Sequence, residues 1–271
     1  QTYEGVIFSI GDTKAGTKMG KLQLKNLADD SVLNCILWEE ALNRIDGKVF
    51  RTGNQVKILG GSYNEKYNNC LITSVELVKE AKLGLDKDER DKLFNAIVEY
   101  ANEIEDEELK KYVTELLFEH EEQFKIAPAA RLMHHNYLGG LVEHTFECLE
   151  IAKCLISNLY KKVDKSCVFA ACILHDFGKI FEYKIDTESG LIEYDEKFPK
   201  EWLTHSQWGF SNCMAHGFKT VAKMIAAHHG RAEWGAIVDL NEKDLDPLLY
   251  LVHHIDDLSA KFGRTAISDL G

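Results

Sequence analysis

The sequence predicts a protein of two parts, an N-terminal five-stranded β-barrel followed by an all-α helical bundle. Short runs rich in β-branched and aromatic residues, separated by turn residues, fill residues 1–80. From residue 85 onward apolar residues recur at helical spacing instead. The 271 residues, of which 45% are hydrophobic, suffice for two modest domains with buried cores. We expect a barrel at 1–80, an acidic helical connector at 81–127 and a helical domain at 128–271.

Five strands and one short helix are expected in the N-terminal part. In chain order they are strands at Tyr3–Ile10, Lys21–Leu27 and Val32–Trp38, a helix at Glu39–Ile45, and strands at Gln55–Leu59 and Leu71–Val78, the last two joined by a loop at Gly60–Asn69. A helix between the third and fourth of five short strands is the order of an oligonucleotide-binding (OB) barrel. The first domain is therefore predicted to be an OB-type barrel.

The net charge of −12 is distributed unevenly. Residues 1–80 are neutral overall, residues 81–125 carry −7 and residues 126–271 carry −5. A nucleic-acid partner is therefore compatible with the barrel, with weak and salt-sensitive binding. The seven Cys form no C-x-x-C pair, no segment has the length of a membrane span, and no leader precedes the first strand, which together favour a cytoplasmic protein without a membrane partner.

Several helices are expected after Pro128. Apolar residues from Leu141 to Leu155 share one helical face, and Asp164 is a candidate N-cap for a helix that reaches His175 and stops at Gly178. Two further amphipathic helices are expected at Thr220–His229 and Pro247–Phe262. The interval Lys184–Trp202 reads as a loop or a small hairpin that borders the site.

Histidines and carboxylates stand at apolar positions of these helices. His144 lies on the apolar face of its helix, the pair His175-Asp176 ends another, and Asp256-Asp257 interrupts the last. Buried ionisable groups are costly unless they are paired or bind a metal. Imidazole and carboxylate together suit Mn²⁺, Fe²⁺, Co²⁺, Ni²⁺ or Zn²⁺, and helices can bring such ligands together inside a bundle. The sequence therefore predicts a divalent metal site, and a carboxylate such as Asp176 could bridge two ions.

These residues resemble the HD superfamily of metal-dependent phosphohydrolases, and more closely its YhaM-type 3′-to-5′ exoribonucleases, which carry an OB domain before the HD domain. The matching runs are His134-His135-Asn136-Tyr137-Leu138-Gly139-Gly140-Leu141-Val142-Glu143-His144-Thr145, Leu174-His175-Asp176-Phe177-Gly178-Lys179, His228-His229-Gly230 and Asp256-Asp257-Leu258-Ser259-Ala260-Lys261. One departure is Thr204 before His205, where the family has Gly. Asp257 competes with Asp256, although the residue before Asp256 matches the family better.

The resemblance implies a role for each matching residue. The ligands of one ion would be His144, His175, Asp176 and Asp256. Asp176 would bridge to a second ion held by His205 and His228, and His229 would be a further ligand or a phosphate contact. Lys179 would touch substrate phosphate or the attacking water, and His135 would contact substrate or support the ligands. The catalytic set would then be Asp176, Lys179 and His229. Two ions are expected, with Mn²⁺ favoured and Mg²⁺ also allowed.

The predicted barrel favours a single-stranded nucleic acid as the substrate, because OB barrels bind single strands by stacking bases on aromatic rings beside a basic groove. The candidate contacts are Trp38, Tyr63 and Tyr67 with Lys14, Lys18, Lys21, Lys57 and Lys66. The leading hypothesis is 3′-to-5′ hydrolysis of single-stranded RNA to nucleoside 5′-monophosphates, with single-stranded DNA as a second substrate and a homo-oligomer as a candidate assembly. The alternatives are hydrolysis of a small or cyclic nucleotide and a non-catalytic nucleic-acid-binding protein.

Overall fold

The structure, a computed structural model, describes residues 2–263 apart from a few short segments. The undescribed positions are residues 1, 14–15, 30, 47–48, 50–52, 81–82, 132–133, 159–162, 188–189, 191, 202–203 and 264–271. Of the sequence predictions, Lys14 and Trp202, the last residue of the interval Lys184–Trp202, lie outside the described residues. The chain divides into two compact units, formed mainly by Gln1–Leu83 and by Gly84–Asp186 with Ile192–Thr265.

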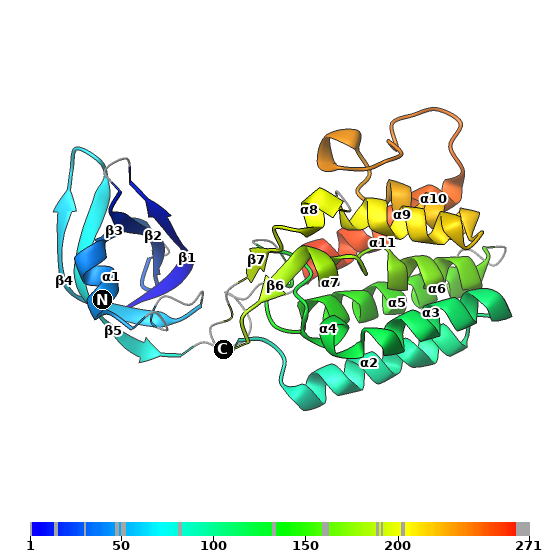
Figure 1. The fold of residues 1–271 in the computed structure, drawn as a ribbon, viewed down its shortest axis with the longest axis horizontal. Coiled ribbons are helices and arrows are strands. Elements are labelled where there is room, and N and C mark those ends of the chain that lie inside the picture. Colours follow the sequence, from blue (N-terminus) through cyan, green and yellow to red (C-terminus); the bar gives the residue numbers. More distant parts are fainter. Residues whose placement is uncertain are drawn as a thin grey trace. The chain divides into compact units, whose positions relative to one another are not determined.

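The first unit is a five-stranded sheet closed into a barrel (Figure 1). Its elements are β1 (Thr2–Asp12), β2 (Lys18–Asn26), β3 (Val32–Trp38), α1 (Glu39–Arg44), β4 (Gln55–Asn64) and β5 (Asn69–Lys79). The strand order is β1-β2-β3-β5-β4, only β3 and β5 run parallel among these pairs, and β1 pairs back with β4. Leu22 and Leu24 of β2 point into the core while Lys21 faces outward, as the period of two in a strand requires. The predicted five strands and intervening helix are confirmed.

The predicted loop at Gly60–Asn69 is wrong, because most of it continues β4 into a hairpin with β5. Strand β4 runs to Asn64 and β5 begins at Asn69. A Cβ at Gly61 would lie 2.5 Å from the carbonyl oxygen of Leu71, so this strand position needs glycine for the close approach of two backbones. The glycine pair marks irregular pairing within the hairpin.

The second unit is helical. Its elements are α2 (Lys87–Asn102), α3 (Glu107–Glu119), α4 (Glu121–Ile126), α5 (Gly140–Asn158), α6 (Lys165–Leu174), α7 (Lys179–Glu182), β6 (Tyr183–Ile185), β7 (Ile192–Tyr194), α8 (Phe198–Glu201), α9 (His205–Ala215), α10 (Lys219–Ala227), the 3₁₀ turn η2 (Ala232–Trp234) and α11 (Pro247–Phe262). Helices α2, α3, α5 and α6 lie side by side, and α10 packs on α9, α6 and α11 (Figure 1). The acidic helices α2–α4 are therefore part of this bundle.

Local signals explain where several of these elements begin. The carboxylate of Asp164 accepts a hydrogen bond from the Cys167 amide, which confirms it as the N-cap of α6. The interval after α7 contains the β6–β7 hairpin, which is one of the two structures predicted for Lys184–Trp202. None of the helices in the described part of the chain has the length and apolar content to cross a membrane.

Candidate metal centre

The first candidate cluster gathers ligand atoms from α5, from the turn after α6 and from α11. The Nε2 atoms of His144 and His175 lie 3.2 Å apart. The Oδ1 atom of Asp256 lies 3.2 Å from Nε2 of His144 and 3.9 Å from Nε2 of His175. The Oδ2 atom of Asp176 lies 3.5 Å from each of these nitrogens. Two imidazoles and two carboxylates thus point at one small volume.

The second cluster lies on the other oxygen of the same carboxylate. The Oδ1 atom of Asp176 lies 3.4 Å from Nε2 of His205 and 3.7 Å from Nε2 of His228. The Nε2 atoms of His205 and His229 lie 3.2 Å apart. The two oxygens of Asp176 therefore face two separate groups of histidines, an arrangement in which one carboxylate could contact an ion on each side.

Hydrogen bonds around the first cluster fix which ring nitrogens carry a proton. The hydroxyl of Ser259 donates to Glu147 at 2.7 Å, so it accepts from Nδ1 of His144 at 2.8 Å. Nδ1 of His175 donates to the carbonyl oxygen of Cys172 at 2.9 Å. With the proton on Nδ1, the neutral form of each ring carries its lone pair on Nε2. The cluster consists of converging acceptors, which fits a cation.

The second cluster repeats this arrangement. Nδ1 of His205 donates to Glu182 at 2.5 Å, and Nδ1 of His228 donates to the carbonyl oxygen of Ile225 at 2.6 Å. Within the described residues, Nε2 of His228 and Oδ1 of Asp176 are buried without a hydrogen-bond partner. Such atoms are costly to bury unless something binds them. A divalent ion would satisfy both.

The carboxylates of the centre are held ionised although burial opposes it. Burial alone would raise the pKa of Asp176, but Lys179, whose Nζ lies 2.5 Å from Oδ2, and His175 outweigh it and hold the pKa well below the usual range. For Asp256, burial is again outweighed by the neighbouring imidazoles, His144 foremost and then His175, and the pKa falls. Ionised carboxylate and neutral imidazole are the forms that bind metal.

Burial should make the metal-free protein sensitive to mild acid. Burial lowers the pKa of His175 from 6.5 to about 4, and burial together with His228 lowers that of His229 to about 2. Between pH 6.5 and 4 the unfolded chain therefore binds protons that the folded chain does not. The free energy of unfolding should fall from pH 7 to pH 5, by on the order of 2 kcal/mol for His175 alone. Urea unfolding in a chelator measures this, and an unchanged or higher value at pH 5 would contradict it.

Gly178 has a different role from the predicted helix stop, because α6 has already ended at Leu174. A Cβ at Gly178 would lie 2.8 Å from Cα and 3.0 Å from Cβ of His205. The missing side chain therefore lets the start of α9 approach Asp176. Thr204, where the family has Gly, caps α9 by accepting from the Gln207 amide.

Replacing Gly178 by Ala should push His205 away from Asp176. We expect a loss of about 1–3 kcal/mol in stability, as for other overpacked sites, and weaker binding of the second ion, measured by isothermal titration with Mn²⁺. Gly217→Ala is the matched control, because a Cβ there meets nothing within 4 Å although its φ of 84° causes strain. Equal metal affinity in both variants would contradict this account of Gly178.

Three further residues of this unit are candidates for the site, and two of them are buried next to it. Lys179 is buried against Asp176. Asp257, the competitor of Asp256, faces outward and pairs with Lys261 at 2.7 Å. The side chain of His135 is fully buried, with Nε2 at 3.2 Å from Glu147. This placement favours support of the ligands over contact with a substrate.

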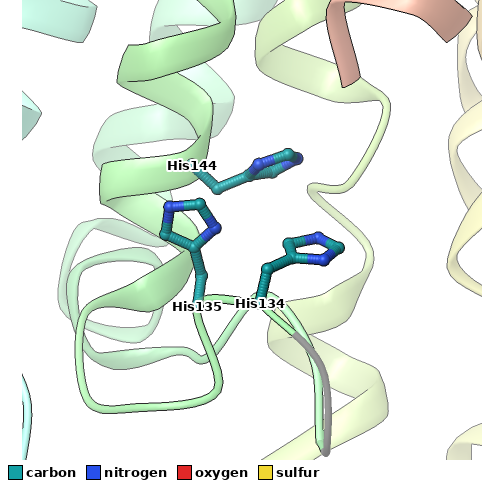
Figure 2. Close-up of side chains that lie close together, drawn as sticks. All are labelled: His134, His135 and His144. Atoms are coloured by element: carbon teal, nitrogen blue, oxygen red, sulfur yellow. The ribbon is translucent and has the colours of Figure 1, made fainter. Parts of the chain in front are cut away.

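Figure 2 shows His134 and His135, from the loop before α5, gathered against His144. Their nitrogens could hold an ion by distance alone. However, His144 directs Nε2 at the first cluster and gives Nδ1 to Ser259, so no nitrogen of its ring is left for a separate site. Burial lowers the pKa of His134 to about 4, which leaves a neutral ring beside the ligands.

Sequence reasoning missed the residues that orient the ligands. Glu182 accepts from both the backbone amide and Nδ1 of His205. The Glu147–Ser259 pair fixes the ring of His144. Such carboxylate–imidazole contacts set the ring tautomer and its direction. No periodicity marks them, although their proximity in sequence to the motif residues was a weak signal.

The predicted nucleic-acid contacts lie in the first unit. Trp38, Tyr63 and Tyr67 are all about half exposed or more, at 47%, 55% and 65%. Trp38 pairs with Met19 across β2 and β3, and Lys21, two residues along β2, shares this outer face. The Nζ atom of Lys66 lies 5.3 Å from the ring centroid of Tyr67. These rings are available for stacking.

Comparison with known proteins gives two matches. The HD domain family model matches residues 141–261, a range that contains every member of both clusters. The chain is also 28% identical over 268 residues to the 3′-5′ exoribonuclease YhaM of Geobacillus sp. (strain WCH70), and this alignment covers 92% of the chain and 79% of the relative. No solved structure matches.

Proposed function

Since residues 141–261 form an HD domain, we propose that this protein is a two-metal phosphodiesterase that removes nucleotides from the 3′ end of single-stranded RNA. The observation that carries the proposal is the position of Asp176, whose two oxygens face two groups of histidines at 3.4–3.7 Å. The exoribonuclease relative, similar over most of the chain, supports the choice of RNA. Single-stranded DNA stays a second predicted substrate.

The chain offers each ion its own set of ligands. One would be held by His144, His175, Asp256 and Oδ2 of Asp176, the other by Oδ1 of Asp176 with His205, His228 and His229. Two divalent ions bound there would supply Lewis acidity and lower the pKa of a bound water. We favour Mn²⁺ and include Fe²⁺, Co²⁺, Ni²⁺, Zn²⁺ and Mg²⁺, because nitrogen and oxygen donors accept all of them to some degree.

The remaining groups act on the substrate. Lys179 would bind a phosphate oxygen once an ion takes over its role beside Asp176, because its ammonium is already directed into the centre. His229 would be a ligand or a phosphate contact. We interpret the barrel at residues 1–80 as an OB-type domain. It would hold the strand through Trp38, Tyr63, Tyr67 and Lys21. A cytoplasmic location and a homo-oligomer stay predictions.

The test uses 5′-end-labelled single-stranded RNA, a panel of small and cyclic nucleotides, and Mn²⁺. We expect a ladder that shortens from the 3′ end, release of nucleoside 5′-monophosphates, and loss of both with Asp176→Ala. Turnover of a small nucleotide without strand cleavage would overturn the proposal in favour of the small-molecule alternative. Strand binding without any hydrolysis would favour a non-catalytic binding protein.

A further inference from the structure

A cavity of about 530 Å³ opens on the second unit beside the β6–β7 hairpin. Cavities of 300–1,000 Å³ are the usual size for small-molecule sites, so a single nucleotide unit is within range. One wall is Arg131, and the hairpin supplies Lys184, Tyr194 and the residues that follow. None of these residues belongs to the two metal clusters.

The cavity contains a half-exposed aromatic ring with an arginine over it. The guanidinium carbon of Arg131 lies 5.5 Å from the ring centroid of Tyr194, and Tyr194 is 48% exposed. The ring of Tyr183 lies 5.2 Å from that of Tyr194 and supports it from within the hairpin. An aromatic ring beside an arginine is the combination on which nucleobases of single strands stack.

The formal charges of the lining cancel. Lys184 pairs with Asp195 at 2.9 Å, which leaves the cations Arg131 and Lys197 and the carboxylates Glu193 and Glu196. A lining without net charge cannot hold a polyanion by electrostatics alone. Stacking and a directed arginine–phosphate contact would supply the affinity, so binding here should depend on a base and only weakly on salt.

One residue links this cavity to the metal centre. The side chain of Glu182 accepts from Nδ1 of His205, and its backbone carbonyl accepts from the Asp195 amide at 2.8 Å. Arg131, which also lines the cavity, precedes His134 by three residues. In Figure 1 the hairpin continues directly from α7. The cavity therefore lies near the metal centre, and a strand whose end is bound there is our candidate occupant.

We propose that the Arg131–Tyr194 cavity is a nucleotide subsite, in which one base of the substrate strand stacks on Tyr194 while Arg131 contacts the adjoining phosphate. The inference rests on the proposed function. It adds a subsite in the helical unit that would favour binding of a nucleic-acid strand over a phosphodiester without a base. Its occupant is a nucleotide of a single-stranded nucleic acid.

The test measures binding and turnover of single-stranded RNA by Arg131→Ala and Tyr194→Leu. We expect Kd, measured by fluorescence anisotropy in a chelator, and KM in Mn²⁺ each to rise about tenfold, with kcat unchanged. Tyr194→Phe should behave as the unaltered protein, because the ring is kept. Lys153→Ala is the matched control, since it removes a cation 4.9 Å from the ring of Tyr100 outside the cavity.

A set of oligonucleotides, each with one abasic position, identifies the nucleotide whose base stacks on Tyr194. We expect the effect of Tyr194→Leu to disappear when one particular base is missing, and to persist at the others. Strand binding and hydrolysis that neither Arg131→Ala nor Tyr194→Leu weakens would overturn the subsite and leave the proposed function standing. If the unaltered protein neither binds nor cuts the strand, both fail together.

Discussion

Replacing Asp176 by Asn is expected to reduce hydrolysis by on the order of 10³-fold or more and to release ions from both clusters. The side chain keeps its shape but loses the charge that faces His144 and His175 on one side and His205 and His228 on the other. An amide is a weak ligand, so neither cluster keeps its central donor. Metal content by mass spectrometry and turnover of labelled RNA measure the two effects.

Asp164→Asn is the matched control for this substitution. Asp164 caps the same helix that leads to Asp176, and Asn is an equally good N-cap, so stability and activity should stay close to those of the unaltered protein. Asp176→Asn also leaves Lys179 buried without its carboxylate, and thermal unfolding checks that the fold survives. A folded Asp176→Asn protein with full metal content would contradict the bridging role.

Replacing Asp256 by Asn should remove one ion, whereas replacing Asp257 by Asn should remove none. Asp256 directs Oδ1 at His144 and His175, while Asp257 forms an exposed pair with Lys261 one helical turn away. We expect activity to fall on the order of 10²- to 10³-fold in the first variant, as for loss of one preorganised electrostatic group. In the second, stability should change by about 0.5 kcal/mol or less.

Because Asp256 and Asp257 are adjacent, the comparison of their Asn variants isolates the direction in which each side chain points. Both variants replace Asp by Asn on α11 and remove one negative charge. A difference between them in metal binding or kcat therefore comes from the side of the helix that each residue occupies. Metal titration and kcat in Mn²⁺ give the readout. Equal losses in the two variants would contradict the first cluster as described.

Features encoded by neighbouring residues could be predicted from the sequence. The Asp164 cap, the alternation around Leu22 and Leu24, and the apolar helix faces depend on short-range patterns. The candidate ligands His144, His175, Asp176 and Asp256 are predicted because ionisable groups at apolar positions conflict with simple packing. The second group, His205, His228 and His229, follows only from the resemblance, since spacing alone does not orient helices.

Features that depend on distant parts of the chain could not be predicted. Gly61 and Gly178 are required by backbones that approach from Leu71 and His205, whereas the sequence predicts only a loop around Gly61 and a helix stop at Gly178. The orienting bond between Glu147 and Ser259 joins residues 112 positions apart. No local pattern encodes such a contact, because it exists only when the bundle has formed.

The most direct test of the two-metal centre is anomalous diffraction from crystals of the protein grown with Mn²⁺. We expect two peaks, one on each side of the Asp176 carboxylate: the first within reach of His144, His175 and Asp256, the second within reach of His205 and His228. A single peak, or peaks that Asp176 does not join, would contradict it.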